Sequence, residues 1–166
     1  MNIALTGLRG SGKSSIGKIL SKKSGWDFID IDEEVEKAEG KKIKDIIEEK
    51  GWDHFRHREK EITQKLADND NKIIATGGGT IIDSENAKAL KRNSKIIYLY
   101  RKPEDCIRHI LDDPNRPPLT NKESLTEEMN QLYVERNGHY CQNSFKIYQR
   151  SEDLVADAET IFKDLF

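Results

Sequence analysis

The sequence predicts an α/β protein built on a parallel sheet with helices on both faces. Short apolar runs alternate with segments whose apolar residues recur at helical spacing, which is typical of strands that alternate with helices. With 166 residues, the chain is long enough for one sizeable core and too short for two ordinary domains. Because no repeat, low-complexity tract or Ser/Gly linker divides it, we expect one domain over residues 1–166.

The first predicted strand and helix lie at the N-terminus. Residues 2–6 form a short apolar run closed by Gly7, the pattern of a buried strand. Beyond Lys13, apolar residues at helical spacing predict a helix that ends at Gly25. Residues 28–29 predict a short second strand.

The next stretch predicts helices in succession. Its apolar residues favour two helical segments that are separated at Gly40, and the second segment ends at Gly51. Ile62 and Leu66 share one face of a further helix that starts near His54.

Two clear strands follow, with a short helix between them. The strands are expected at residues 72–76 and 95–100, and the helix at residues 86–90. Another helix is expected to start at Pro103, because proline tolerates the first turn of a helix and the acidic residues after it favour the positive end.

The last third of the chain begins with a polar loop. Residues 112–122 contain three of the chain's four prolines, which exclude a regular helix, so we expect a mobile loop there. Residues 124–127 fit a capping box that opens a helix through Arg136. Residues 145–148 predict a last edge strand, and residues 154–166 a closing amphipathic helix.

The charge balance excludes partners that are bound through bulk charge. Lysine and arginine number 28 and aspartate and glutamate 30, and the net charge of −2 argues against nucleic-acid or anionic-membrane binding. No apolar run approaches the ~20 residues of a membrane span, and Arg9 and Lys13 follow Met1 too closely for a secretory signal. Cys106 and Cys141 lack metal-ligand spacing and favour a reducing compartment, so we expect a cytoplasmic protein.

A phosphate-binding motif spans residues 7–14, which read Gly-Leu-Arg-Gly-Ser-Gly-Lys-Ser and fit G-x-x-x-x-G-K-[ST]. Its glycines let successive backbone N–H groups point at a phosphate, and the helix that follows adds its positive end. Lys13 suits the β- and γ-phosphates of a nucleotide, and the Ser14 hydroxyl suits Mg²⁺. The alternative is a glycine turn with a surface lysine, but the predicted strand before the motif and helix after it favour a phosphate loop. The nucleotide-binding residues expected here are Gly10, Ser11, Gly12, Lys13, Ser14 and Ser15.

Asp30 and Asp32 are the candidate acidic residues. They follow the predicted strand at residues 28–29, and ligands of a parallel sheet bind at the carboxyl ends of its strands. Residues two apart on an extended segment point the same way, so we expect both carboxylates to face one cleft. The alternative is that Asp32 only caps a helix that begins at Glu33.

Several further motifs follow in a specific order: Phe28-x-Asp30-x-Asp32, Gly40, Gly51, Phe55-Arg56-x-x-Glu59, Gly77-Gly78-Gly79, Arg116-Pro117 and Arg136…Tyr140. Together with the phosphate loop, they resemble the shikimate kinase family over nearly the whole chain. The resemblance implies a three-layer P-loop fold of the nucleoside-monophosphate-kinase type with about five parallel strands. It implies a substrate-binding region at about 31–62 and a mobile lid at about 112–122. It also implies ATP- and Mg²⁺-dependent phosphorylation of the shikimate 3-hydroxyl.

Two arginines are candidates for binding a carboxylate substrate. Arg56 and Glu59 are three apart on a predicted helix, so the acid can brace the guanidinium, although an ordinary solvated ion pair is the alternative. If Arg56 and Arg136 converge, they form a fork suited to a small carboxylate. Taken alone, Arg136 equally suits the C-terminal end of its helix. Gly77, Gly78 and Gly79 are expected to form a turn at which backbone amides can approach the ligand closely. The alternative is that the three glycines form only a flexible turn.

The resemblance assigns roles to individual side chains. Asp32 matches an aspartate that contacts substrate hydroxyl groups, and Asp30 lies toward the metal. Arg116, in the expected lid, would stabilise the transferring phosphoryl group, although loop arginines are usually only solvated. Arg108 falls where the family packs a side chain near adenine, and Arg150 is a further candidate to border the base.

Three residues depart from the family pattern. Trp52 stands where the family more often has glutamate, and Ile47 replaces a common phenylalanine near the substrate pocket, so both bear on pocket shape. Pro118 takes a lid position usually held by leucine, and a second proline is expected to stiffen the lid.

We therefore expect direct in-line transfer of the γ-phosphoryl group of ATP to shikimate. Lys13, Mg²⁺ bound by Ser14 and Arg116 would neutralise the developing charge, and Asp32 would orient the attacking hydroxyl. The expected partners are ATP and shikimate, with no nucleic acid and no membrane, and the chain is expected to be a monomer. The alternatives are another small-metabolite kinase, such as a gluconate kinase, or a non-catalytic nucleotide-dependent switch. A nucleoside-monophosphate kinase would need a second base-binding pocket, which the sequence does not identify.

Overall fold

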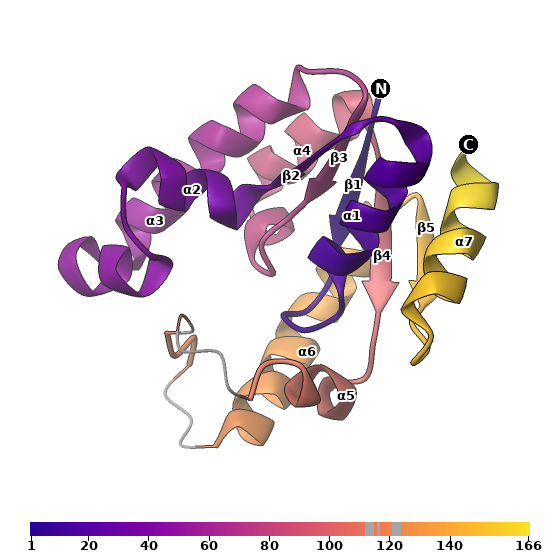
Figure 1. Ribbon diagram of the computed structural model, residues 1–166. Coiled ribbons are helices and arrows are strands. Elements are labelled where there is room, and N and C mark those ends of the chain that lie inside the picture. The colour runs from indigo at the N-terminus through magenta and orange to yellow at the C-terminus, as the bar shows by residue number, and fades with distance from the viewer. Residues whose placement is uncertain (112–114, 116, 121–123) are drawn as a thin grey trace.

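The computed structural model describes residues 1–111, 115, 117–120 and 124–166, and it places a five-stranded sheet between two layers of helices (Figure 1). The strand order is β2-β3-β1-β4-β5, and every neighbouring pair is parallel. This confirms the predicted α/β fold, and each predicted strand is present. The strands are β1 (Asn2–Thr6), β2 (Asp27–Asp30), β3 (Lys72–Ala75), β4 (Ser94–Tyr100) and β5 (Lys146–Gln149).

The helices follow the predicted alternation with the strands. One short 3₁₀ helix, η1, was not predicted; it follows the glycine turn after β3. The helices are α1 (Lys13–Ser24), α2 (Ile31–Glu39), α3 (Ile43–Ala67), η1 (Thr80–Ile82), α4 (Ser84–Asn93), α5 (Pro103–Arg108), α6 (Leu125–Asn143) and α7 (Leu154–Leu165).

Helix α6 is longer than the sequence pattern predicted. Its N-terminal cap is as expected, because the Ser124 hydroxyl accepts a hydrogen bond from the backbone N–H of Glu127. The predicted end at Arg136 is wrong, since the helix continues to Asn143. Tyr140, fully buried, packs in the core one turn beyond Arg136, and this packing outweighs the weak helix propensity of the residues between them.

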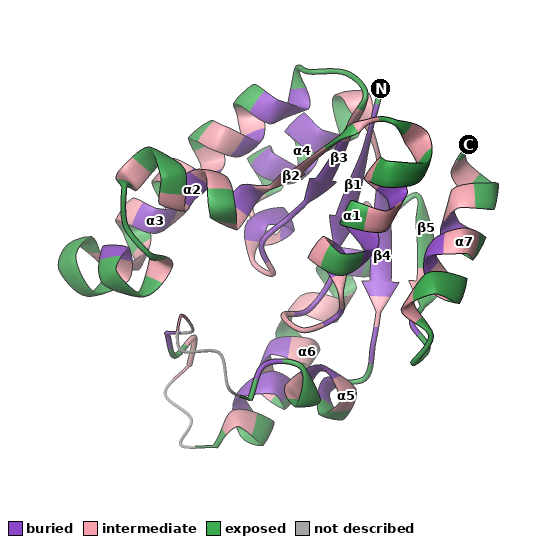
Figure 2. Ribbon diagram, viewed as in Figure 1, coloured by how far each residue is buried: buried purple, intermediate pink, exposed green. Residues whose placement is uncertain are grey.

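Alternating side chains of the sheet build two cores. Ile3 and Leu5 of β1 pack in the core beneath α1 and α7, whereas Ala4 between them packs in the core beneath α3, α4 and α6. The inner strands β1, β3 and β4 are buried along most of their length, as parallel strands covered on both faces are, whereas the edge strands β2 and β5 are partly exposed (Figure 2). The two layers hold the carboxyl ends of the strands in fixed positions.

A third, small cluster joins α2 to the first part of α3. Val35, Ile46 and Phe55 are buried in it, and these two helical segments project beyond the sheet (Figure 1). Gly40 ends α2 in the left-handed conformation. At Gly51 the backbone of α3 has a φ of 82° and a ψ of 170°, so the helix is interrupted where the sequence predicted an end. The projecting segment thus has its own packing and its own hinge point.

The expected lid falls largely outside the described residues, which omit residues 112–114, 116 and 121–123. In the part that is described, Pro118 is exposed and the backbone N–H of Leu119 donates to Glu128 of α6. Within the described ranges, no helix has the length and apolar character needed to cross a bilayer.

Gly51→Ala is expected to destabilise the fold by about 1–3 kcal/mol, because its φ and ψ lie in a region that only glycine adopts at low cost. A Cβ at this position would meet nothing within 4 Å, so backbone strain is the whole effect. Gly138→Ala is the matched control: it lies inside α6, its Cβ would also be free of contacts, and alanine there should stabilise the helix by about 0.5–1 kcal/mol. Urea denaturation of both variants measures the difference, and equal stabilities would contradict the interpretation of the kink.

Candidate active site

A cleft of about 520 Å³ opens at the carboxyl ends of the strands. In parallel sheets ligands bind at this edge, because loops from several strands meet there. All five strand ends supply residues to it: the phosphate loop after β1, Asp30 and Asp32 at β2, residues 76–79 after β3, Arg101 after β4 and Arg150 after β5.

The phosphate loop connects β1 to α1 through turns that need glycine. Gly10 and Gly12 have φ values of 81° and 93°. A Cβ on Gly10 would lie 2.4 Å from the carbonyl oxygen of Cys106, so α5 packs too closely against the loop for any side chain there. Helix α1 begins at Lys13, and its first unpaired N–H groups therefore face the loop.

Lys13 lies folded over the loop that precedes it. Its Nζ donates to the carbonyl oxygens of Gly7 and Leu8, each at 2.9 Å. Burial lowers the pKa of Lys13 to about 8, against the opposing effect of the Asp32 and Asp30 carboxylates. A polyanion in the cleft would raise this pKa again, because opposite charge favours the protonated amine. Lys13 is thus suited to bind phosphate groups.

Ser14 and Asp30 place oxygen atoms together beside the loop. The Ser14 Oγ donates to the Asp30 Oδ2 over 2.5 Å. Oxygen donors of this kind fit Mg²⁺, which usually takes one or two protein ligands and completes its shell with water and substrate phosphates. The described residues include no group of three or more His, Cys, Asp or Glu side chains arranged for a metal, so Ser14 and Asp30 would hold Mg²⁺ only together with water and phosphate oxygens.

The expected geometry of Asp30 and Asp32 is corrected by the structure. Asp30 ends β2 and caps α2, accepting a hydrogen bond from the backbone N–H of Asp32 at 3.0 Å. Asp32 lies within the first turn of α2, not on an extended segment, and it is not the cap of a helix that begins at Glu33. Both carboxylates nevertheless line the cleft, because the turn from strand to helix occurs at its edge.

Asp32 lies close to a second carboxylate. A Cβ on Gly77 would be 2.8 Å from both the Asp32 Oδ1 and the Glu59 Oε1, so the two acids face the same glycine. Burial raises the pKa of Asp32 to about 7, and the negative charges of Glu59 and Asp30 add to this rise. A carboxyl with a pKa near 7 can accept a proton at neutral pH.

Arg56 and Glu59 form more than a solvated surface pair. The Arg56 Nη1 donates to the Glu59 Oε2 at 2.8 Å, and the Glu59 side chain is only 1% exposed. The other oxygen of Glu59 accepts from the Thr80 hydroxyl at 2.6 Å. Glu59 therefore links the guanidinium to the turn after β3, with both of its oxygens engaged.

The glycine turn brings Arg56 and Arg136 into one site. A Cβ on Gly79 would lie 2.6 Å from the Arg56 Nη2, and one on Gly78 would lie 3.2 Å from the Arg136 Nη1. Tyr140, one turn along α6 from Arg136, donates its hydroxyl to the Gly78 carbonyl oxygen at 2.6 Å. The two arginines thus lie against neighbouring glycines of one turn and line the same cleft, and Arg136 does not serve the end of its helix.

The other predicted residues lie in different places. Ser11 is buried in the phosphate loop, and Ser15 lines the cleft at the start of α1. Arg108 is exposed on α5, paired with Asp105, and lies outside the residues that line the cleft. Its assignment to adenine stays a prediction. Arg116 lies outside the described residues.

Four ionisable residues that line the cleft were missed by the sequence interpretation. They are Arg9 in the phosphate loop, Arg101 directly after β4, His109 after α5 and Glu152 after β5. Two of them could have been predicted, because Arg9 lies inside the phosphate-binding motif and Arg101 lies at the carboxyl end of a predicted strand. His109 and Glu152 carried no local signal, because only the packing of distant segments brings them to the cleft.

The two departures near the substrate region differ in their consequences. Trp52 lines the cleft, and its ring lies 5.3 Å from the Arg56 Cζ, within the range of a cation–π contact. Ile47 instead packs on the small cluster between α2 and α3 and is not among the lining residues. Trp52 is therefore the departure that shapes the cleft.

Asp32→Asn is expected to stabilise the protein at pH 8 by up to about 4 kcal/mol, because folding raises the pKa of Asp32 from 3.8 to about 7. Because the pKa of Asp32 is raised by folding, its ionised form opposes folding, and one pKa unit corresponds to about 1.4 kcal/mol. The penalty is absent near pH 4, grows as the pH rises toward 7 and is complete above it. Chemical denaturation of both proteins at pH 4.5 and pH 8 should show a much larger gain at the higher pH. Asp53→Asn, at an exposed position of α3, is the control, and a gain equal at both pH values would contradict the environment described for Asp32.

Comparison with known proteins agrees with this geometry. The family described as "Shikimate kinase" matches residues 9–166. A shikimate kinase of Persephonella marina is 41% identical over 88% of this chain and 87% of its own, and one of Thermodesulfovibrio yellowstonii is 36% identical over 98% and 94%. The solved structure of a shikimate kinase from Acinetobacter baumannii in complex with shikimate matches with a TM-score of 0.94 and 30% identity, over 99% of this chain and 92% of that one. The chain belongs to the shikimate kinase family.

Proposed function

We propose that the chain transfers the γ-phosphoryl group of ATP to the 3-hydroxyl of shikimate, giving shikimate 3-phosphate and ADP. The observation that carries this proposal is that a phosphate loop and two arginines line one cleft, together with Asp32, whose pKa is shifted by both Lys13 of the loop and Glu59, the partner of Arg56. A triphosphate and a small carboxylic acid would then be held side by side. Chemistry between them needs positioning and charge neutralisation more than covalent help, so transfer is direct.

The nucleotide side of the site consists of the phosphate loop and the start of α1. Backbone N–H groups of Gly10 and Gly12 would bind the phosphates, together with the positive end of the helix, whereas the Ser11 N–H donates to the Leu8 carbonyl oxygen at 3.1 Å and holds the loop turn. Lys13 would exchange its contacts with the loop carbonyls for contacts with the β- and γ-phosphates. Mg²⁺, held by Ser14 with Asp30 beside it, would supply neutralisation of charge on the phosphate oxygens.

The acceptor side consists of the two arginines and the glycine turn. Arg56 and Arg136 would bind the carboxylate of shikimate from two directions, with Glu59 fixing Arg56. The absence of side chains at the turn would let the ring pack against the backbone. Asp32 would accept a hydrogen bond from the attacking hydroxyl and take its proton, which its raised pKa favours.

Arg116 is proposed to complete the charge neutralisation from the lid. An arginine carried by a closing segment excludes water and adds a donor where negative charge develops. We further propose that the enzyme acts in the cytoplasm as a monomer.

A panel assay tests the proposed function. ADP release from ATP is measured with shikimate, gluconate, AMP or no acceptor, using the wild-type chain and Asp32→Asn. We expect release with shikimate alone and loss of at least 100-fold in turnover in the variant. Release only with gluconate or AMP would identify a different acceptor. ATP hydrolysis alone would favour a nucleotide-dependent switch.

Arg56→Lys is expected to raise the KM for shikimate by about 10–100-fold while leaving the KM for ATP within about twofold. Lysine keeps the charge but loses the planar fork that contacts a carboxylate and Glu59 together. Arg58→Lys is the matched control, because Arg58 lies two residues away on α3 and pairs with Glu39 and Glu61 outside the cleft. Steady-state kinetics with each substrate varied in turn provide the measurement, and an unchanged KM for shikimate would exclude Arg56 from carboxylate binding.

A further inference from the structure

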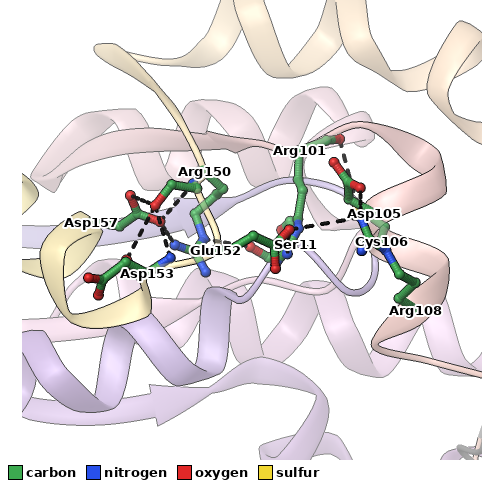
Figure 3. Close-up of polar contacts among 10 residues, drawn as sticks. Ser11, Arg101, Asp105, Cys106, Arg108, Arg150, Glu152, Asp153 and Asp157 are labelled. Atoms are coloured by element: carbon green, nitrogen blue, oxygen red, sulfur yellow. Dashed lines mark hydrogen bonds and ion pairs between the residues drawn. The ribbon is translucent and has the colours of Figure 1, made fainter.

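Arg150 lies against the phosphate loop, directly after β5. Its side chain is 3% exposed, and its Nε donates to the carbonyl oxygen of Ser11 at 3.0 Å (Figure 3). Its backbone N–H donates to the carbonyl oxygen of Tyr100 at 2.8 Å, so the residue is anchored to the end of β4 as well. The guanidinium therefore reaches the loop from a fixed point of the sheet.

The guanidinium also covers the next residue of the loop. A Cβ on Gly12 would lie 3.1 Å from the Arg150 Nη2 and 3.2 Å from its Nε. The peptide between Ser11 and Gly12 thus has its carbonyl oxygen bound to Arg150. Because a trans peptide is planar, its N–H points opposite to its carbonyl, so the Gly12 N–H is directed away from the guanidinium. The Gly12 N–H is thus left to donate to a ligand on the other side of the peptide, as backbone N–H groups of a phosphate loop do.

Asp157 holds the guanidinium in this orientation. Its Oδ2 is paired with the Arg150 Nη1 and also accepts the backbone N–H of Ser151 at 2.9 Å, while its Oδ1 accepts the Ser151 hydroxyl at 2.8 Å (Figure 3). Asp157 lies in the first turn of α7, which is capped by Asp153. A carboxylate with both oxygens engaged and a fixed backbone orients its arginine partner closely.

The surroundings leave the loop few other side-chain anchors at this point. The Ser11 Oγ is buried without a hydrogen-bond partner among the described residues, so its side chain does not fix the peptide. The neighbouring guanidinium of Arg101 is engaged by Glu152 at 3.1 Å, which leaves Arg150 as the contact to the Ser11 carbonyl. Removing the Arg150 side chain would also leave the partly buried Asp157 carboxylate without its ion-pair partner, so the substitution should perturb this region strongly.

We infer that Arg150 is a positioning residue for the phosphate loop, which sets the Ser11–Gly12 peptide for phosphate binding, and that Asp157 fixes Arg150 for this role. The inference rests on the proposed function, since it assumes that this loop binds the ATP phosphates. It differs from the expectation that Arg150 borders the base. A base contact acts on the adenine alone, whereas a positioned loop acts on the phosphates whatever is attached to them.

Binding of two ligands separates these roles. Dissociation constants for ADP and for inorganic tripolyphosphate, which has no base, are measured by calorimetry on the wild-type chain, Arg150→Met and Arg150→Lys. We expect Arg150→Met to raise the dissociation constants of both ligands by a similar factor of about tenfold, which corresponds to the loss of one hydrogen bond from a charged group. Arg150→Lys should recover part of the loss. The KM for ATP should rise by the same factor, with the KM for shikimate within about twofold.

Two further variants keep the test decisive if Arg150→Met does not fold. Asp157→Asn retains an acceptor for Ser151 but loses the charge that orients Arg150. It should raise the dissociation constants of both ligands by about threefold or more. Asp164→Asn is the matched control, because it removes another ion pair between α7 and β5, with Lys146, away from the loop. It should leave both dissociation constants unchanged.

The outcomes that overturn the inference are distinct from failure of the proposed function. Loss of ADP binding with unchanged tripolyphosphate binding would assign Arg150 to the base. Normal binding of both ligands in Arg150→Met or Asp157→Asn would exclude a positioning role, and equal weakening by Asp164→Asn would assign the effect to general loosening of α7. A wild-type chain that binds neither ligand would contradict the proposed function itself.

Discussion

All five strands of the sheet are parallel, and this one constraint places the segments that follow the strands at the same edge, where Arg56 of α3 and Arg136 of α6 meet them. Five segments that line the cleft each follow a different strand. They are the phosphate loop, the acidic pair, the glycine turn, Arg101 and Arg150. Helices on both faces bury the strands and fix their ends relative to one another. The distances between groups from opposite ends of the chain, such as Ser11 and Arg150, are therefore set by the sheet.

The charges in the cleft are arranged at a cost to the fold. Lys13 is buried so that its pKa falls, and Asp32 is buried beside Glu59 so that its pKa rises. Burial disfavours the charged form of each group, and the proposed phosphates and substrate hydroxyl would give each a further partner. Active sites commonly oppose folding in this way, because the environment that favours the reaction disfavours the free protein. The buried ion pairs at Glu59 and Arg150 hold the surrounding segments in place against this cost.

Local backbone requirements explain which parts of the site were predictable. The phosphate loop was recognisable because its glycines and its lysine are all needed within one short segment of chain. Arg56 and Glu59 could be placed together because residues three apart on a helix lie on the same face. Asp30 and Asp32 were given the wrong geometry, since one residue decides whether a strand continues or a helix begins. The place of Arg136 depends on the length of α6 and on the contact between Tyr140 and Gly78, and neither leaves a local signal.

The turn after β3 shows why three glycines stand in sequence at the centre of this site. Each faces a different functional group: Gly77 the carboxylates of Asp32 and Glu59, Gly78 the guanidinium of Arg136, and Gly79 that of Arg56. None of the three has a positive φ, so conformational freedom does not explain them. A methyl group at Gly77 or Gly79 would lie 2.8 or 2.6 Å from these polar atoms, closer than any real contact. A side chain at either position would displace these carboxylates or this guanidinium, so the glycines let the functional groups of the site pack directly against the turn.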